Sequence, residues 1–129
     1  MPGDRAVAAA DGRLTLLGRE SVTINTGGEK VFAEEVEQAL KQHPAVWDVT
    51  VVGTPHERWG QQVTAVVALR EGARVDEDAL RATVREHLAG YKVPRAFVFV
   101  GEVVRAPSGK ADYRWAKQTA LAALGIAAA

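Results

Sequence analysis

The sequence predicts an α+β fold, a mixed α/β sandwich in which an N-terminal β-hairpin and a small three-stranded sheet are flanked by about three helices. Three observations support this prediction. The length of 129 residues suits one domain. Runs of β-branched residues with alternating or continuous apolar side chains mark strands, and apolar residues at helical spacing mark helices between them.

A glycine-tipped hairpin is expected near the start of the chain. Residues 21–26 (SVTINT) are β-branched and nearly alternating, with Val22 and Ile24 on one face. Gly27-Gly28 breaks this run, and residues 30–32 return as a second strand. The two glycines therefore mark the tip of the hairpin.

One helix and two strands are expected next. Residues 33–43 carry apolar side chains at helical spacing and acidic residues in the first turns, and His43-Pro44 ends this pattern. Residues 47–52 and 62–69 are nearly continuous runs rich in Val and Thr, which predict neighbouring buried strands. A loop over residues 53–60 separates them.

The last part of the chain predicts a helix, a strand and a final helix. Asp76 is a suitable N-cap for the first helix, residues 96–100 form a third strand, and Asp112 caps the last helix. Trp47 and Trp115 fall within the patterns of these elements, so we expect both indole rings in the core.

The composition excludes several classes of function. The chain has sixteen basic and sixteen acidic residues and a formal net charge of zero, so no excess positive charge favours binding to nucleic acid. It has no cysteine, which excludes disulfides, thiolate nucleophiles and cysteine-ligated zinc. Because no apolar run is long enough to span a membrane and no signal-peptide pattern is present, we expect a cytoplasmic protein.

The histidines do not predict a metal site. His43, His56 and His87 are the three histidines of the chain, and their spacing matches no metal-binding motif. The sequence also lacks the GxSxG pattern of a hydrolase nucleophile. We therefore expect this chain to hold neither a metal ion nor a catalytic triad.

A lysine lies at the tip of a predicted loop. Ser108-Gly109-Lys110 superficially resembles a phosphate-binding P-loop, but Val104 replaces the required glycine and Ala111 replaces the required Ser or Thr. A solvated lysine in a turn is therefore the simpler interpretation from composition alone. The alternative is that a rigid domain presents this one cation to a phosphate.

Two further signals have two interpretations each. Residues 25–30 (NTGGEK) form either an ordinary hairpin tip, which is the simpler interpretation, or a segment whose glycines let the backbone approach a ligand. Trp59 lies in a polar loop, where its ring either stacks on a planar ligand or packs the loop against the domain.

Several short sequence motifs follow one another along almost the whole chain. They are LGRESVTINTGGEKVFAEEVE (residues 17–37), HPAV (43–46), VVGTP (51–55), WGQ (59–61), YKVPR (91–95) and PSGK (107–110). In this order they resemble the C-terminal domain of the adenylate-forming (AMP-forming) acyl-CoA synthetases. The greatest similarity is to the fatty-acid–CoA ligases of actinobacteria.

This resemblance implies an enzyme of two domains. A large N-terminal domain binds ATP, Mg²⁺ and the carboxylic acid, and a small C-terminal domain swings between a pose that forms the acyl-adenylate and a pose that forms the CoA thioester. Residues 1–20 are then the inter-domain arm and the approach to the hinge, and residues 21–129 are the mobile domain. The implied substrates are ATP, a fatty acid and CoA, and the chain without its N-terminal partner is expected to be inactive.

The resemblance also implies roles in adenylation. Lys110 matches the adenylation lysine, which bridges the substrate carboxylate and the α-phosphate as charge shifts in the transition state. Asp4 matches the residue that accepts hydrogen bonds from the ribose, Arg19 the hinge arginine near the nucleotide, and Lys30 a basic residue near the nucleotide phosphate. Because Asp4 lies so near Met1, we expect the native protein to continue upstream.

A second set of residues is implied for the CoA step. Gly27 and Gly28 match the hairpin tip along the pantetheine tunnel, where the lack of side chains lets the backbone approach the thiol arm. Trp59 and Tyr91 are expected to contact the CoA adenine.

Two positions depart from the family pattern. Ser21 stands at the hinge, where Asp or Lys is usual; it permits the backbone rotation but supplies no charge for an electrostatic latch. Val93 stands where some relatives carry a basic residue for the CoA 3′-phosphate. Two alternatives to the CoA ligase stay open: a non-catalytic interaction module of the same fold, and an adenylating domain that serves a carrier protein.

Overall fold

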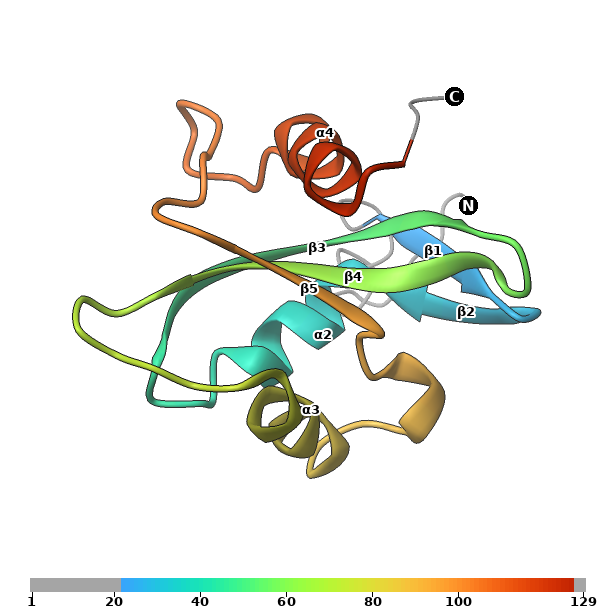
Figure 1. Cartoon of the computed structure of the whole chain (residues 1–129), viewed down its shortest axis with the longest axis horizontal. Helices are drawn as coiled ribbons and strands as arrows, with labels where there is room; N and C mark the ends of the chain where they lie inside the picture. Colours follow the sequence, from blue (N-terminus) through green and yellow to red (C-terminus); the bar gives the residue numbers. More distant parts are fainter. Residues whose placement is uncertain (1–21, 127–129) are drawn as a thin grey trace, which may run out of the picture.

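The computed structural model describes residues 22–126 and confirms the α+β class. One five-stranded sheet carries helices on both of its faces (Figure 1). The elements are β1 (Thr23–Thr26), β2 (Glu29–Phe32), α2 (Ala33–Leu40), β3 (Val46–His56), β4 (Gly60–Leu69), α3 (Glu77–Arg85), the 3₁₀ helix η1 (Gly90–Lys92), β5 (Ala96–Val100) and α4 (Tyr113–Leu124). No helix in this part of the chain is long and apolar enough to cross a membrane.

The strand β4 lies at the centre of the sheet. It pairs antiparallel with β3 along its length and parallel with β5 on its other side. The predicted hairpin β1–β2 is present and joins the same sheet through the pair Thr26 and Gly60, which gives the order β2-β1-β4-β3. The hairpin and the predicted three-stranded sheet are therefore parts of one mixed sheet.

The predicted loop over residues 53–60 is wrong, because β3 and β4 are longer than the sequence indicated. Residues 53–56 continue β3, and residues 57–59 form the turn. Pro55 does not end the strand because β3 lies at the edge of the sheet. At Val49 and Val51 the backbone N–H groups donate to carboxylates and not to β4, so Pro55, on the same side of the strand, has no sheet partner to lose.

Two hydrophobic clusters cover the two faces of the sheet. The larger cluster lies between the sheet and the helices α2 and α3 and includes Leu40, Val51 and Leu80. The smaller cluster lies under α4 and includes Val52 and Ala116. Figure 1 shows α4 on one face of the sheet and α2 and α3 on the other. Neighbouring residues of β3 thus enter different clusters, as expected for a strand that is covered on both faces.

The expectation that Trp47 lies in the core is wrong. This residue is 64% exposed, and the Arg70 guanidinium lies 5.2 Å from the centre of its ring. The pairing of β3 with β4 shifts register between Val46 and Asp48, and such an irregularity re-aims the side chain at that position. Trp115, in contrast, is partly buried and packs against the smaller cluster.

The two predicted helix caps are present. Asp76 accepts a hydrogen bond from the Ala79 N–H at 2.8 Å, and Asp112 accepts one from the Trp115 N–H at 3.0 Å. Each aspartate satisfies a backbone donor that the first turn of a helix otherwise leaves unpaired. The start of α4, a few residues after Lys110, is therefore fixed by the local sequence.

Candidate functional site: the Lys110 loop and the hairpin tip

Lys110 lies in the loop between β5 and α4, as expected. The loop is closed by an isolated bridge between Arg105 and Ala111, and the Ala106 N–H donates to the Lys110 carbonyl at 2.9 Å. Gly109 has a φ of +89° and its N–H donates to the Ala106 carbonyl at 2.8 Å. An exposed lysine is thus presented from a closed, hydrogen-bonded turn.

An ion pair fixes the first arm of this loop to the edge strand β3. The Arg105 guanidinium forms two bonds with the Asp48 carboxylate, Nε to Oδ2 at 2.9 Å and Nη2 to Oδ1 at 2.6 Å. It also donates to the Gly109 carbonyl at 3.2 Å, and Lys41 lies 3.5 Å from Asp48. Burial acts to raise the pKa of Asp48, but the hydrogen bonds and charge of Arg105 outweigh burial and hold this pKa below its usual value.

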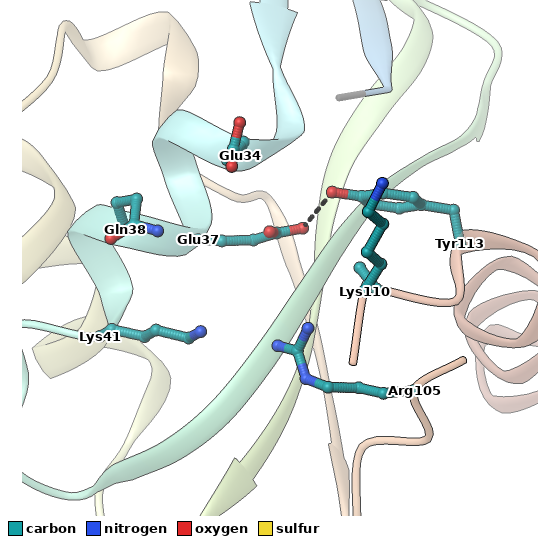
Figure 2. A pocket seen from close by; sticks show the side chains of 8 residues that line it. Glu34, Glu37, Gln38, Lys41, Arg105, Lys110 and Tyr113 are labelled. Carbon is teal, nitrogen blue, oxygen red and sulfur yellow. Dashed lines mark hydrogen bonds between the residues drawn. The ribbon is translucent and has the colours of Figure 1, made fainter. Parts of the chain in front are cut away.

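A buried carboxylate fixes the second arm of the loop. Glu37 of α2 is 6% exposed, and its Oε2 accepts hydrogen bonds from the Val51 N–H of β3 and the Tyr113 O–H of α4, both at 3.0 Å (Figure 2). Burial raises the pKa of Glu37 to about 7, although these two bonds and the charge of Lys41 act to lower it. The carboxyl therefore gains and loses its proton near neutral pH.

Lys110, Arg105, Glu37 and Tyr113 line one pocket of about 470 Å³ between α2 and the loop (Figure 2). Three cationic side chains line it, those of Lys41 at the C-cap of α2 and of Arg105 and Lys110 in the loop. The carboxylates of Glu34 and Glu37 lie on its α2 side. Lys41 and Arg105 both pair with Asp48, whereas the Lys110 side chain extends away from them in Figure 2, and an exposed lysine ammonium suits a phosphate or carboxylate group.

The glycine tip of the β1–β2 hairpin packs against the β3–β4 turn. The Gly27 N–H donates to the Trp59 carbonyl at 2.9 Å, and a Cβ atom on Gly27 would lie 2.9 Å from Cε3 of the indole. Gly27 and Gly28 have φ angles of +60° and +87°, which only glycine adopts at little cost. A Cβ atom on Gly28 would meet open space, so this residue is accessible to a ligand.

Trp59 packs the turn against the domain, one of the two roles that the sequence left open. The guanidinium groups of Arg95 and Arg58 lie 4.4 Å and 5.1 Å from the centre of its ring. Its backbone N–H donates to Nδ1 of His56 at 3.3 Å. Contact of this ring with the CoA adenine stays a prediction.

Tyr91 lines a second pocket, of about 350 Å³, beside η1. Tyr91 is 44% exposed, and the side chains of Arg81, Arg85 and Arg95 make the wall of this pocket basic. Arg81 already pairs with two carboxylates of α3. Arg85 and Arg95 therefore supply the positive charge that would attract an anionic ligand to this pocket. Val93 also lines the pocket but is buried and uncharged, so the positive charge there comes from the two arginines.

Comparison with known proteins identifies the domain. Residues 35–110 match the family model described as the AMP-binding enzyme C-terminal domain. The chain belongs to this family. It is 63% identical over 122 residues to the 3-oxocholest-4-en-26-oate–CoA ligase of Rhodococcus rhodochrous and 60% identical over 121 residues to the medium-chain acyl-CoA ligase Mig of Mycobacterium avium. Each match covers 94% of this chain but 22% of the ligase, so the chain spans about a fifth of the length of these relatives.

A solved structure supports the same assignment. An acyl-CoA synthetase of Brucella canis aligns with this chain at a TM-score of 0.74 and 29% identity. The alignment covers 85% of this chain and 21% of that protein. The AMP-binding enzyme C-terminal domain seen here is thus similar in fold to part of a solved synthetase.

The predicted site residues of this family domain fall into two groups at opposite ends of the sheet (Figure 1). The loop that carries Lys110 lies at one end, and the turns that carry Gly27-Gly28 and Trp59 lie at the other. Tyr91 belongs to the second group, because Arg95 both lies over the Trp59 ring and lines the Tyr91 pocket.

The remaining predicted residues are not brought to either pocket by the described structure. Lys30 is exposed on β2, where it pairs across the hairpin with Asn25, and it lines neither of the two pockets. Asp4, Arg19 and Ser21 lie outside the described residues. Their nucleotide and hinge roles stay predictions.

Glu37 is the main residue that sequence reasoning missed. A signal was present: Glu37 comes four residues after Ala33 and three before Leu40, both fully buried, so it lies on the apolar face of α2. An acidic residue on such a face needs hydrogen-bond partners. The partners, Val51 and Tyr113, come from β3 and α4 and become visible with the fold.

Proposed function

We propose that this chain is the mobile C-terminal domain of an ATP-dependent, AMP-forming acid–CoA ligase. The observation that carries the proposal is the separation of its two functional groups, with the β5–α4 loop, which carries Lys110, at one end of the sheet and the tip of the β1–β2 hairpin at the other (Figure 1). A rigid domain brings one end at a time to a single active centre. A reaction in two steps therefore requires the domain to turn between them.

In the first step, a carboxylate oxygen of the acid attacks the α-phosphorus of ATP and pyrophosphate leaves. Negative charge gathers between the carboxylate and the α-phosphate, and Lys110 supplies a cation that bridges the two. The closed turn and the anchors at Asp48 and Glu37 fix the loop that carries this cation before the reaction begins. Preorganisation of this kind lowers the barrier because little rearrangement is left for the transition state.

In the second step, the thiol of CoA attacks the acyl carbonyl and AMP leaves. Gly28 projects no side chain into the open space beside the hairpin tip, which leaves room for the narrow pantetheine arm. Arg85 and Arg95 bind a phosphate of the CoA nucleotide beside Tyr91, whose exposed ring is available for stacking on adenine.

The other predicted contacts belong to the same proposal. Asp4, Arg19 and Lys30 contact the nucleotide, and the chain divides at Ser21 into an arm and the mobile domain. As the family resemblance implies, we assign Mg²⁺ to the N-terminal partner domain. The acid is a fatty or sterol-derived acid, since the two similar ligases are named for such acids.

A graft tests this proposal. The chain replaces the matching 22% of the Rhodococcus ligase, which supplies the N-terminal domain. Lys110→Ala is expected to lower acyl-AMP formation, measured as pyrophosphate release, by roughly 100- to 1,000-fold, as for the loss of one transition-state donor. Thioester formation from supplied acyl-AMP should be largely spared. Lys117→Ala, on α4 and outside both pockets, is the matched control and should change neither step.

Three outcomes would contradict the proposal. An equal loss of both half-reactions in Lys110→Ala would refute the role of this lysine in adenylation. A folded but inactive wild-type graft would favour the non-catalytic interaction module, and acyl transfer to a carrier-protein phosphopantetheine in place of CoA would favour the third alternative.

A further inference from the structure

Glu37 stands out among the charged residues because it is buried and joins three elements. Over residues 22–126 it is the one charged residue in the buried class. It belongs to α2, and its Oε2 accepts hydrogen bonds from the Val51 N–H of β3 and from the Tyr113 O–H of α4. Burying a carboxylate is costly. The two hydrogen bonds to Glu37 therefore either offset this cost or also hold the neighbouring site in place.

Tyr113 connects this carboxylate to the Lys110 loop. It is the first residue of α4, and only Ala111 and Asp112 separate it from Lys110. Ala111 is bridged to Arg105, and Asp112 caps α4, so the backbone of both residues is held by hydrogen bonds. A displacement of the Tyr113 ring therefore carries Lys110 with it.

We propose that Glu37 is a positioning residue for Lys110: through Tyr113 it holds the start of α4, and with it the Lys110 loop, against the edge strand β3. This inference rests on the proposed role of Lys110 in adenylation. Arg105 and Asp48 hold the other arm of the loop to the same strand. The two anchors are separate pairs of side chains, so loss of one leaves the other to keep the loop folded.

The anchor at Glu37 is sensitive to pH. Burial places the pKa of Glu37 at about 7, so the carboxylate is ionised above that pH and protonated below it. The charged or titratable groups around it are Glu34 of α2, Lys41 at the C-cap of α2, Arg105 and Lys110 of the loop, and Tyr113 of α4. An ionised carboxylate accepts the Tyr113 O–H more strongly than a neutral one does, so this one hydrogen bond strengthens as the pH rises through about 7, although ionisation of the buried carboxyl lowers the stability of the domain as a whole.

The first test measures the coupling in the 129-residue chain itself. NMR titrations between about pH 5 and about pH 9 follow the Glu37 carboxyl carbon and the backbone amides of residues 109–111 in the wild type, in Glu37→Gln and in Tyr113→Phe. We expect the amides to titrate with Glu37 at about pH 7 in the wild type, and this transition to be absent in both variants.

The second test asks whether the coupling matters for the reaction. In the graft on the Rhodococcus ligase, Glu37→Gln and Tyr113→Phe should each lower acyl-AMP formation about tenfold, the effect of losing one hydrogen bond to a charged group. Thioester formation from supplied acyl-AMP should change by less than about twofold. Thr50→Val is the matched control, because it removes a buried hydroxyl of β3 that has no hydrogen-bond partner among the described residues.

The outcomes separate this inference from the proposed function. Loop amides that titrate unchanged in Glu37→Gln or in Tyr113→Phe would overturn the positioning role, whatever the activities show. Equal loss of both half-reactions would also overturn it, because it indicates a general loosening of the domain. If instead Lys110→Ala spares adenylation, the proposed function of Lys110 is wrong. Glu37 then has no role in catalysis through Lys110, even where the NMR titration confirms that Glu37 and the loop amides are coupled. Tyr113→Phe removes a single hydroxyl, so it keeps the test decisive where Glu37→Gln does not fold.

Discussion

At the scale of single residues, Glu37 makes stability depend on pH, because its pKa rises from 4.5 to about 7 in the folded chain. The folded chain binds this proton more tightly than the unfolded chain does. The contribution of Glu37 is therefore fully favourable below about pH 4.5 and is lost as the pH rises through about 7, a change of about 3 kcal/mol in the free energy of unfolding.

Urea unfolding of the wild type and Glu37→Gln at a series of pH values checks this prediction. Glutamine cannot ionise, so the variant should gain stability relative to the wild type as the pH rises from about 5 to about 8. The histidines and the other acidic residues are shared by both proteins, so their effects cancel in the difference. Parallel stability curves over this range would contradict the burial of an ionisable Glu37.

The sequence predicted some of these residues better than others. The Pro-Ser-Gly context was enough to place Lys110 in a loop, because its turn chemistry is local. The burial of Glu37 depends on Tyr113, which lies 76 positions further along the chain. Trp47 was misjudged for a similar reason, since its exposure depends on the register of β3 against β4.

Between elements, the pair Arg105 and Asp48 joins the Lys110 loop to β3 and is expected to contribute to stability. Arg105→Lys keeps the positive charge but cannot form both bonds to the carboxylate. Because the two side chains are 29% and 17% exposed, we expect the free energy of unfolding to fall by about 1–2 kcal/mol.

Unfolding in urea at different pH values measures this loss and its origin. The pKa of Asp48 is lowered by folding, so the pair stabilises the domain above the usual value of 3.8 and its effect is lost as the pH falls below it. The difference in the free energy of unfolding between the wild type and Arg105→Lys should therefore become smaller as the pH falls below 3.8. Lys41→Ala removes the longer 3.5 Å contact and is the matched control, with a smaller effect. A pH-independent difference would assign the loss to packing and not to the ion pair.

The elements themselves were largely predictable, but their limits and partners were not. Helical spacing and two aspartate caps located the helices, because both signals are contained in a few consecutive residues. The extension of β3 through Pro55 was missed, since a proline is compatible with a strand only when that strand lies at a sheet edge. Edge position is a property of the whole sheet.

Over the domain as a whole, the order of motifs along the chain identified the family but gave no distances between the motifs. The sequence brings Gly28 and Lys30 close together in the chain and sets Lys110 far from both. The fold adds that the Lys110 loop and the glycine tip occupy opposite ends of one sheet (Figure 1). This opposition is the physical basis for the proposal that the domain serves two steps of one reaction in turn.

A pair of variants in the grafted Rhodococcus ligase tests this division of labour. Lys110→Ala should impair acyl-AMP formation and spare thioester formation, whereas Gly28→Leu, which fills the open space at the hairpin tip, should do the reverse. Gly72→Leu controls for backbone strain, because Gly72 also has a positive φ and open space around it but lies in another turn. The decisive measurement is the ratio of the two half-reaction rates in each variant. We predict that this ratio moves in opposite directions for Lys110→Ala and Gly28→Leu and stays at the wild-type value for Gly72→Leu; the same ratio in all of them would contradict a domain that uses its two ends for two steps.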